Sequence, residues 1–133
     1  MASIFITKLR ALISIDAAAE GARRTVITDI AGQSDTYAAK RVEAASFIAA
    51  KLANPAALPG PYLTADVAEN GGDAVAKANA IVAASNDYLV NKDPMIEAKR
   101  IGGKARVRAA STVDDVEAER VAAVAAINAL LAA

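Results

Sequence analysis

Residues 54–63 read Asn-Pro-Ala-Ala-Leu-Pro-Gly-Pro-Tyr-Leu and hold three of the four prolines of the chain. Proline lacks a backbone N–H and disfavours helical geometry in the residue before it, so helices end at such a stretch. Alanine-rich blocks with helical spacing lie on both sides of it. We therefore expect a Pro-rich loop at 54–63 that connects two helical hairpins.

The block before this loop, residues 35–53, predicts a helix. Ser34 or Asp35 is a suitable N-cap, and Asn54-Pro55 ends the helix. Its apolar residues share one face or lie beside that face: Tyr37, Ala44, Ile48, then Ala38, Val42, Ala45 and Leu52.

The block after the loop, residues 65–90, also has helical spacing, with Thr64 as the expected cap. Gly71-Gly72 interrupts it, and each glycine costs a helix about 1 kcal/mol relative to alanine. We expect either a kink at the glycines or a short helix followed by a longer one that restarts at Asp73.

The N-terminal block, residues 1–31, has one clear apolar stripe. Ser14 or Asp16 could cap this helix, and residues 3–13 either extend it or form a separate segment. The stripe residues recur at spacings of three and four: Ile15, Ala19, Ala22, Val26 and Ile30.

Two further helices follow towards the C-terminus. Asp93-Pro94 combines a cap with proline at the first helical position, which predicts a helix start. This helix runs to about residue 110. The last helix starts at Ser111-Thr112, with Asp114 and Asp115 placed for a capping box. Its stripe is Val113, Val116, Val124, Ile127 and Leu131.

The composition supports an all-α fold. The chain has 133 residues, of which 36 are alanine, the best helix former. No alternating run predicts a strand. We expect a single helical domain over 1–133, a small bundle of four to five Ala-rich helices. A buried methyl contributes only about 0.8 kcal/mol, so this thin core favours an oligomer or a larger assembly over a stable monomeric bundle.

Composition also argues against several classes of function. The chain has no Cys and no His, which removes thiolate zinc sites and the commonest general base. Its 15 basic and 15 acidic residues balance, which argues against nucleic-acid binding. Its longest uncharged run is too short to span a bilayer. We expect no catalytic residues, no cofactor, no metal and no membrane contact, and a protein that is not an enzyme.

Charged residues gather near the C-terminus. A basic run is followed by an acidic cluster, and antiparallel packing of the last two helices would bring them together. We expect a solvated or salt-bridged face here and no phosphate contact. The two groups are Lys99, Arg100, Lys104, Arg106 and Arg108, then Asp114, Asp115, Glu117 and Glu119.

The chain termini are the candidate contact surfaces. Ile4-Phe5-Ile6 either completes the core or docks on a partner, and residues 1–14 are a candidate docking segment. The C-terminal run allows the same two interpretations. The candidate protein-interface residues are Ile4, Phe5, Ile6, Val124, Ile127 and Leu131.

Several short motifs follow one another in an order that supports a family resemblance. They are Ile15-Asp16, Arg23-Arg24, Ile27-Thr28, Gly32-Gln33, Tyr37, Lys40, Glu43-Ala44, Pro61-Tyr62-Leu63 and Ile96-Glu97 with Arg100. The series resembles the small helical region of tailed-bacteriophage proteins associated with tail fibres or with tail-fibre assembly. The resemblance extends from about residue 15 to the end of the chain.

The resemblance implies a non-enzymatic structural protein, made in the host cytoplasm and located in the virion. Its partners would be other tail or tail-fibre proteins, contacted through helix faces. Two alternatives are a tail-fibre assembly chaperone that is absent from the particle and a capsid decoration protein.

Overall fold

The structure is a computed structural model. It describes residues 3–31 and 34–132, and the side chains of all of these except 28–31 and 34. This part of the chain is helical and contains no strand, which confirms the all-α fold predicted from the sequence. It divides into two compact units, Met1–Val26 with Val90–Ala133 and Ile27–Leu89. That both fold together as one domain stays a prediction.

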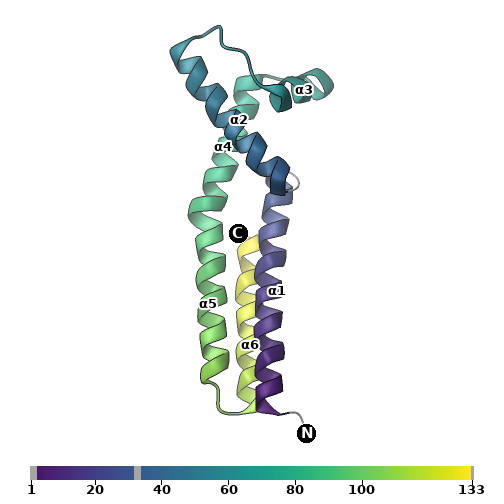
Figure 1. The fold of residues 1–133 in the computed structure, drawn as a ribbon, viewed down its shortest axis with the longest axis vertical. Helices are drawn as coiled ribbons and strands as arrows, with labels where there is room; N and C mark the ends of the chain where they lie inside the picture. The colour runs from purple at the N-terminus through teal and green to yellow at the C-terminus, as the bar shows by residue number, and fades with distance from the viewer. Residues whose placement is uncertain (1–2, 32–33, 133) are drawn as a thin grey trace. The chain divides into compact units, whose positions relative to one another are not determined.

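Unit 1 is built from three helices that run side by side (Figure 1). They are α1 (Ile4–Ala31), α5 (Asp93–Ala109) and α6 (Val113–Ala129). Only the part of α1 up to Val26 belongs to unit 1. A 3-10 turn, η2 (Leu130–Ala132), follows α6. Two ion pairs show that α5 is antiparallel to α1. The Arg106–Glu119 pair and the approach of Gly103 to Ala123 show that α5 is antiparallel to α6 as well. The buried core is Ala11, Ile15, Ala19, Ala22, Ile96, Val107, Val116, Ala123 and Ile127.

A glycine sets how closely α5 approaches α6. Gly103 is buried, and a Cβ added to it would lie 2.6 Å from the Cβ of Ala123 and 3.6 Å from Cδ1 of Ile15. Real Cβ atoms do not come so close, so the helices meet here because one residue has no side chain. The two helices therefore approach closely at Gly103, and α5 is not interrupted there.

Unit 2 contains α2 (Ser34–Ala53), α3 (Pro61–Asn70) and α4 (Ala74–Asp87). Its core is formed by Ala44, Phe47, Leu63 and Ala78, with partly buried aliphatic residues around them. Tyr37 of α2 meets Tyr88 edge to face, with ring centroids 6.0 Å apart and planes at 83°. Edge-to-face geometry is a favourable arrangement for aromatic rings.

Two helix starts lie earlier than the sequence predicts. α1 begins at Ile4, where the Ser3 hydroxyl accepts a hydrogen bond from the Phe5 N–H, so residues 3–13 extend the helix and Ser14 and Asp16 lie inside it. The predicted caps at these two positions are therefore wrong. The cap at Thr64 is wrong as well, because α3 begins at Pro61.

The start of α3 is capped by another helix. The Glu43 carboxylate of α2 accepts hydrogen bonds from the backbone N–H groups of Tyr62 at 2.9 Å and Leu63 at 2.7 Å. The N-cap residue itself, Gly60, offers no side chain for this purpose. Nothing in the local sequence predicts this bond, because donor and acceptor are about twenty residues apart.

Two other predicted starts are confirmed. Gly71 and Gly72 have φ values of +73° and +92°, which favour glycine, and they separate α3 from a second helix. The Asp73 side chain then caps α4 by accepting from the Ala76 N–H at 2.9 Å. Thr112 caps α6 in the same way, by accepting from the Asp115 N–H.

α5 begins at Asp93 with Pro94 in its first turn, as the sequence predicts, but the chain before it is already helical. A π-helical turn, η1 (Tyr88–Lys92), links α4 to α5, so the described chain forms five continuous helical rods. Proline has no N–H, and its ring crowds the carbonyl four residues earlier, here that of Val90. The π turn lies at this point of the chain. The N-cap position of α5 is Lys92, so Asp93 does not cap the helix.

The apolar faces are predicted well for α1 and α6 and less well for α2. Ile15, Ala19, Ala22 and Val26 are buried as expected, and the Ile30 side chain lies outside the described set. In α2 the sequence misses Phe47, which is buried. The residues expected at its edge are exposed, Val42 by 59% and Leu52 by 85%.

Candidate functional site

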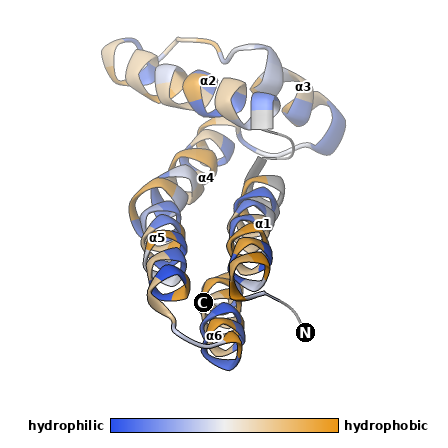
Figure 2. Ribbon diagram, turned by 60° about the horizontal axis from the view of Figure 1, so that its bottom comes forward, coloured by the Kyte–Doolittle hydropathy of each residue, from blue (hydrophilic) through white to orange (hydrophobic). Residues whose placement is uncertain are grey.

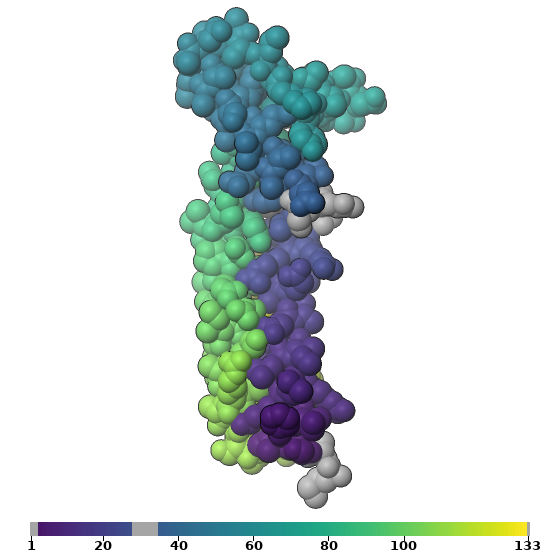
Figure 3. Space-filling view, viewed as in Figure 1, coloured from purple at the N-terminus to yellow at the C-terminus, as the bar shows by residue number. Residues whose placement is uncertain are grey.

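The strongest candidate site is an apolar face of α1 that no described residue covers. Phe5, Ile6, Leu9 and Ile13 are 69%, 40%, 47% and 60% exposed. Their spacings of three and four residues place them on one side of the helix, opposite the buried Ala11 and its neighbours. We call these four residues the α1 stripe. The first turns of α1, purple in Figure 3, lie open on the face shown.

The structure divides the six predicted interface residues into two groups. Ile127 is fully buried, and Ile4 and Val124 are partly buried and pack against the core of unit 1. These three residues stabilise the unit itself. Phe5 and Ile6 belong to the α1 stripe, and Leu131, 36% exposed, lies at the other end of the chain in η2.

The other two residues of the stripe, Leu9 and Ile13, were not predicted from the sequence as contact residues. Leu9 and Ile13 continue from Phe5 at intervals of four residues, and this spacing is visible in the sequence. α1 is apolar on two faces, however, and spacing alone does not say which one packs inside. Figure 2 shows how often hydrophobic residues, in orange, recur along this helix.

The charged residues of α1 that flank the stripe are positive. Lys8 and Arg10 are the only charged residues before Asp16 in the chain. Lys8 donates a hydrogen bond from Nζ to the backbone oxygen of Arg108 at 2.7 Å, which brings the end of α5 beside α1. Arg10 is exposed. The stripe is therefore an apolar surface with a cationic edge.

Ion pairs hold α1 against α5 further along the helix from the stripe. Arg23 bonds to Asp93 and Glu97, and Arg100 bonds to Glu97 and Asp16. Lys104 completes the set by pairing with Asp16 at 2.8 Å. We call these six residues the ion network: Asp16, Arg23, Asp93, Glu97, Arg100 and Lys104.

The ion network shifts the pKa values of Glu97, Asp16 and Arg100. Hydrogen bonds from Arg100 and then Arg23 lower the pKa of Glu97 from 4.5 to about 2. The pKa of Asp16 is lowered chiefly by its hydrogen bond from Lys104. The pKa of Arg100 is raised by its hydrogen bonds to Glu97 and Asp16. All these groups stay charged near neutral pH, which suits a structural link between helices.

The basic run is a salt-bridged face, as predicted, although its partners differ. Arg106 pairs with Glu119 of the acidic cluster at 3.1 Å. Arg100 and Lys104 pair with Asp16 of α1. The sequence indicated the pairing of α5 with α6 and missed the pairing with α1, because Asp16 lies more than eighty residues away.

Residues that carry the phage resemblance meet in the structure of this chain. Asp16, Arg23, Glu97 and Arg100 belong to the ion network, and Glu43 caps the helix that starts at Pro61-Tyr62-Leu63. Residues far apart in sequence thus form two structural contacts. In this chain, helix pairing and helix capping account for these five residues of the motifs.

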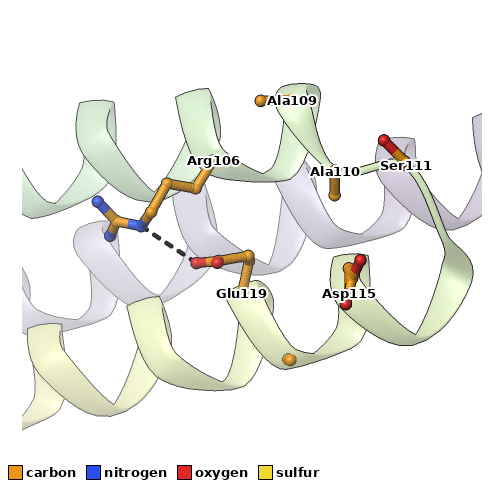
Figure 4. Close-up of a pocket in the computed structure, with 7 residues that line it drawn as sticks. Arg106, Ala109, Ala110, Ser111, Asp115 and Glu119 are labelled. Carbon is orange, nitrogen blue, oxygen red and sulfur yellow. Dashed lines mark hydrogen bonds and ion pairs between the residues drawn. The ribbon is translucent and has the colours of Figure 1, made fainter.

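A second candidate is a cavity of about 330 Å³ where α5 turns into α6 (Figure 4). Its polar side chains are those of Arg106, Ser111, Asp115 and Glu119, and alanines form the rest. Arg106 and Glu119 neutralise each other across it. Asp115 occupies the first turn of α6, where a carboxylate interacts favourably with the helix dipole. Helix pairing and capping thus use these groups.

Neither a metal-binding cluster nor a membrane-spanning helix occurs among the described residues. Among the described residues, no group of three or more Asp, Glu, His or Cys is placed to hold a metal ion. Within the same residues, no helix has both the length and the apolar composition needed to cross a bilayer.

Comparisons of this chain with protein-family models, with curated proteins and with solved structures found no match. The site must therefore be interpreted from its own geometry.

Proposed function

We propose that this chain is a non-enzymatic structural protein of a tailed-bacteriophage particle, associated with the tail or the tail fibres. It acts by packing the α1 stripe against neighbouring proteins of the virion. The observation that carries the packing role is the exposure of four large apolar side chains on one helix face. The phage context rests on the sequence resemblance.

A stripe of this kind fits protein contact better than catalysis. Phe5, Leu9 and Ile13 are large apolar side chains, which supply binding energy by leaving water. The cationic edge formed by Lys8 and Arg10 would lie at the rim of such a contact, where charges remain hydrated. The opposite face of α1 is packed in the core of unit 1, so the stripe is presented on a supported helix.

The first test counts this chain in purified particles by quantitative mass spectrometry. A few copies per particle, in multiples of three or six, are expected for a tail or fibre protein. Hundreds of copies would favour a capsid decoration protein. No copies in the particle, with the protein present in the infected-cell lysate, would exclude the structural role and favour an assembly chaperone.

The second test asks whether the stripe makes the contact. We expect Ile13→Ser to reduce incorporation into particles at least about fivefold, since a lost apolar contact costs over about 1 kcal/mol. Ile101→Ser on α5 is a matched control, because Ile101 is 56% exposed and Ile13 is 60% exposed. Equal incorporation of both variants, with unchanged helicity, would exclude the stripe as the contact surface.

A further inference from the structure

The two units carry opposite net charges although the whole chain is neutral. Unit 1 holds eleven basic and eight acidic residues, a net charge of +3, and unit 2 holds four basic and seven acidic residues, a net charge of −3. Opposite net charges attract two copies when unit 1 of one approaches unit 2 of the other. Two copies that approach unit 1 to unit 1 repel each other, because both units carry a net charge of +3.

This charge pattern argues against contact between two identical stripes. Such a pair would bring together two copies of Lys8 and Arg10, with no carboxylate before Asp16 on either α1. It would also bring together two units of charge +3. The α1 stripe therefore fits a surface on unit 2 of another copy better than it fits itself.

Unit 2 has an apolar groove beside α2. Its lining is mostly apolar, its volume is about 240 Å³, and its floor is Phe47, which is 4% exposed. One wall is Leu58 of the Pro-rich loop, a leucine left 86% exposed. We call this feature the α2 groove; it is lined by Glu43, Ser46, Phe47, Ala50, Leu58 and Gly60.

The groove is shaped by the same contacts that cap α3. The Glu43 side chain reaches the α3 backbone past Gly60, where an added Cβ would lie 2.5 Å from Oε1 of Glu43. Small-molecule sites usually have volumes of roughly 300–1,000 Å³. The α2 groove is smaller than these and suits an inserted apolar side chain, such as that of Phe5, better than a cofactor.

We propose that the α1 stripe of one copy docks in the α2 groove of a second copy, so that this chain associates head to tail. This inference rests on the proposed function, in which the stripe is the contact surface, and names one of its partners. Because the two contact surfaces differ, the contact is heterologous and builds a ring or an open filament.

Sedimentation equilibrium of the full chain tests this proposal. We expect association that depends on concentration and weakens about tenfold or more between roughly 0.05 and 0.5 M NaCl, because the charges of the units are screened. A stripe variant, Leu9→Gln with Ile13→Gln, and a groove variant, Ala50→Gln with Leu58→Gln, should each remain monomeric. Leu52→Gln is the matched control, because Leu52 is 85% exposed and does not line the groove.

Mixing the two variants gives the decisive result. The stripe variant keeps an intact groove, and the groove variant keeps an intact stripe. An equal mixture should form dimers and nothing larger, since only one productive contact remains for each pair. Far-UV circular dichroism checks that every variant keeps the helicity of the parent chain.

Three outcomes would overturn head-to-tail association: a monomeric parent chain up to about 0.5 mM, well above ordinary micromolar affinity, a mixture of variants that stays monomeric, or variants that associate like the parent chain. If the parent chain is monomeric but Ile13→Ser still blocks incorporation into particles, the proposed function stands and this inference fails. If self-association occurs and the particles contain no copies, the reverse holds.

Discussion

Gly102 and Gly103 are neighbours in α5 with opposite structural roles. A Cβ at Gly103 would collide with Ala123 of α6, whereas a Cβ at Gly102 would meet only Nη1 of Arg106 at 3.3 Å. The end of a flexible arginine side chain can move aside, but a packed helix cannot. One glycine is therefore required by packing and the other is not.

Gly103→Ala should lower the free energy of unfolding by about 1–3 kcal/mol, the usual cost of overpacking a core. Gly102→Ala is the matched control and should raise it by up to about 1 kcal/mol, because alanine favours the helix. Urea denaturation followed by far-UV circular dichroism measures both. Similar effects of the two substitutions would contradict the close approach of α5 and α6.

At the scale of single residues, the sequence predicted what depends on local chemistry. Helix starts were predicted at Asp73 and at Ser111-Thr112, where the structure has Asp73 and Thr112 as caps, because a cap acts within three residues of itself. Phe47 and Leu9 were missed for a different reason. Their helices carry apolar residues on more than one face, and only tertiary packing decides that Phe47 is buried and Leu9 exposed.

Among the elements, α3 depends on a carboxylate from another helix. Glu43 accepts two hydrogen bonds from the first turn of α3, which has no side-chain cap of its own. The connection also fixes the Pro-rich loop, because the loop joins the two helices that Glu43 links. This short helix is thus held by a contact outside its own sequence.

Glu43→Ala should lower the free energy of unfolding by about 1–2 kcal/mol, as the loss of an N-cap does. The amides of Tyr62 and Leu63 should also exchange with solvent faster, which hydrogen-exchange NMR detects. Glu69→Ala, at an exposed position of the same α3, serves as the control. Unchanged exchange at Tyr62 and Leu63 in Glu43→Ala would rule out the cap.

The pairing of α1 with α5 should depend on pH. The folded pKa of Glu97 is about 2 and its ordinary value is 4.5, so the carboxyl is depressed in the folded chain. A depressed carboxyl stabilises the fold above its unfolded pKa, and this contribution is lost as the pH falls towards the folded pKa. Stability should therefore decline between about pH 5 and pH 2.

Glu97→Gln should flatten this decline, because glutamine has no proton to gain in that range. The measurement is the free energy of unfolding by urea at several pH values for the parent chain and the variant. Asp16 should contribute a further loss in acid, since its pKa is also lowered. An identical slope in both proteins would show that Glu97 is not linked to folding through the ion network.

Most of the packing of helices against each other could not be predicted from the sequence. The Pro-rich loop and the Gly71-Gly72 break were predicted, since both are local signals. The pairing of Asp16 with Lys104 and the passage of the helix through η1 were not predicted. Contacts between residues far apart in the chain cannot be predicted from a single sequence. The Asp93-Pro94 pair predicts a helix start whether or not a π turn precedes it.

At the scale of the whole molecule, each of the two units has a core of its own among the described residues. The core of unit 1 and the core of unit 2 share no residue, and the chain passes between the units within α1 and within η1. We therefore expect Gly103→Ala to weaken hydrogen-exchange protection mainly in unit 1. Equal loss across Ile27–Leu89 would support the single cooperative domain that the sequence predicts.

The placement of the aromatic residues has a practical consequence for unfolding experiments that use fluorescence. The chain has no tryptophan, and its three tyrosines, Tyr37, Tyr62 and Tyr88, all lie in unit 2. Ultraviolet fluorescence excited near 280 nm will therefore report on unit 2 and ignore unit 1, whose only aromatic ring is Phe5. A melting curve recorded by emission describes half of this protein, and a tryptophan introduced into α5 or α6 would make the other half visible.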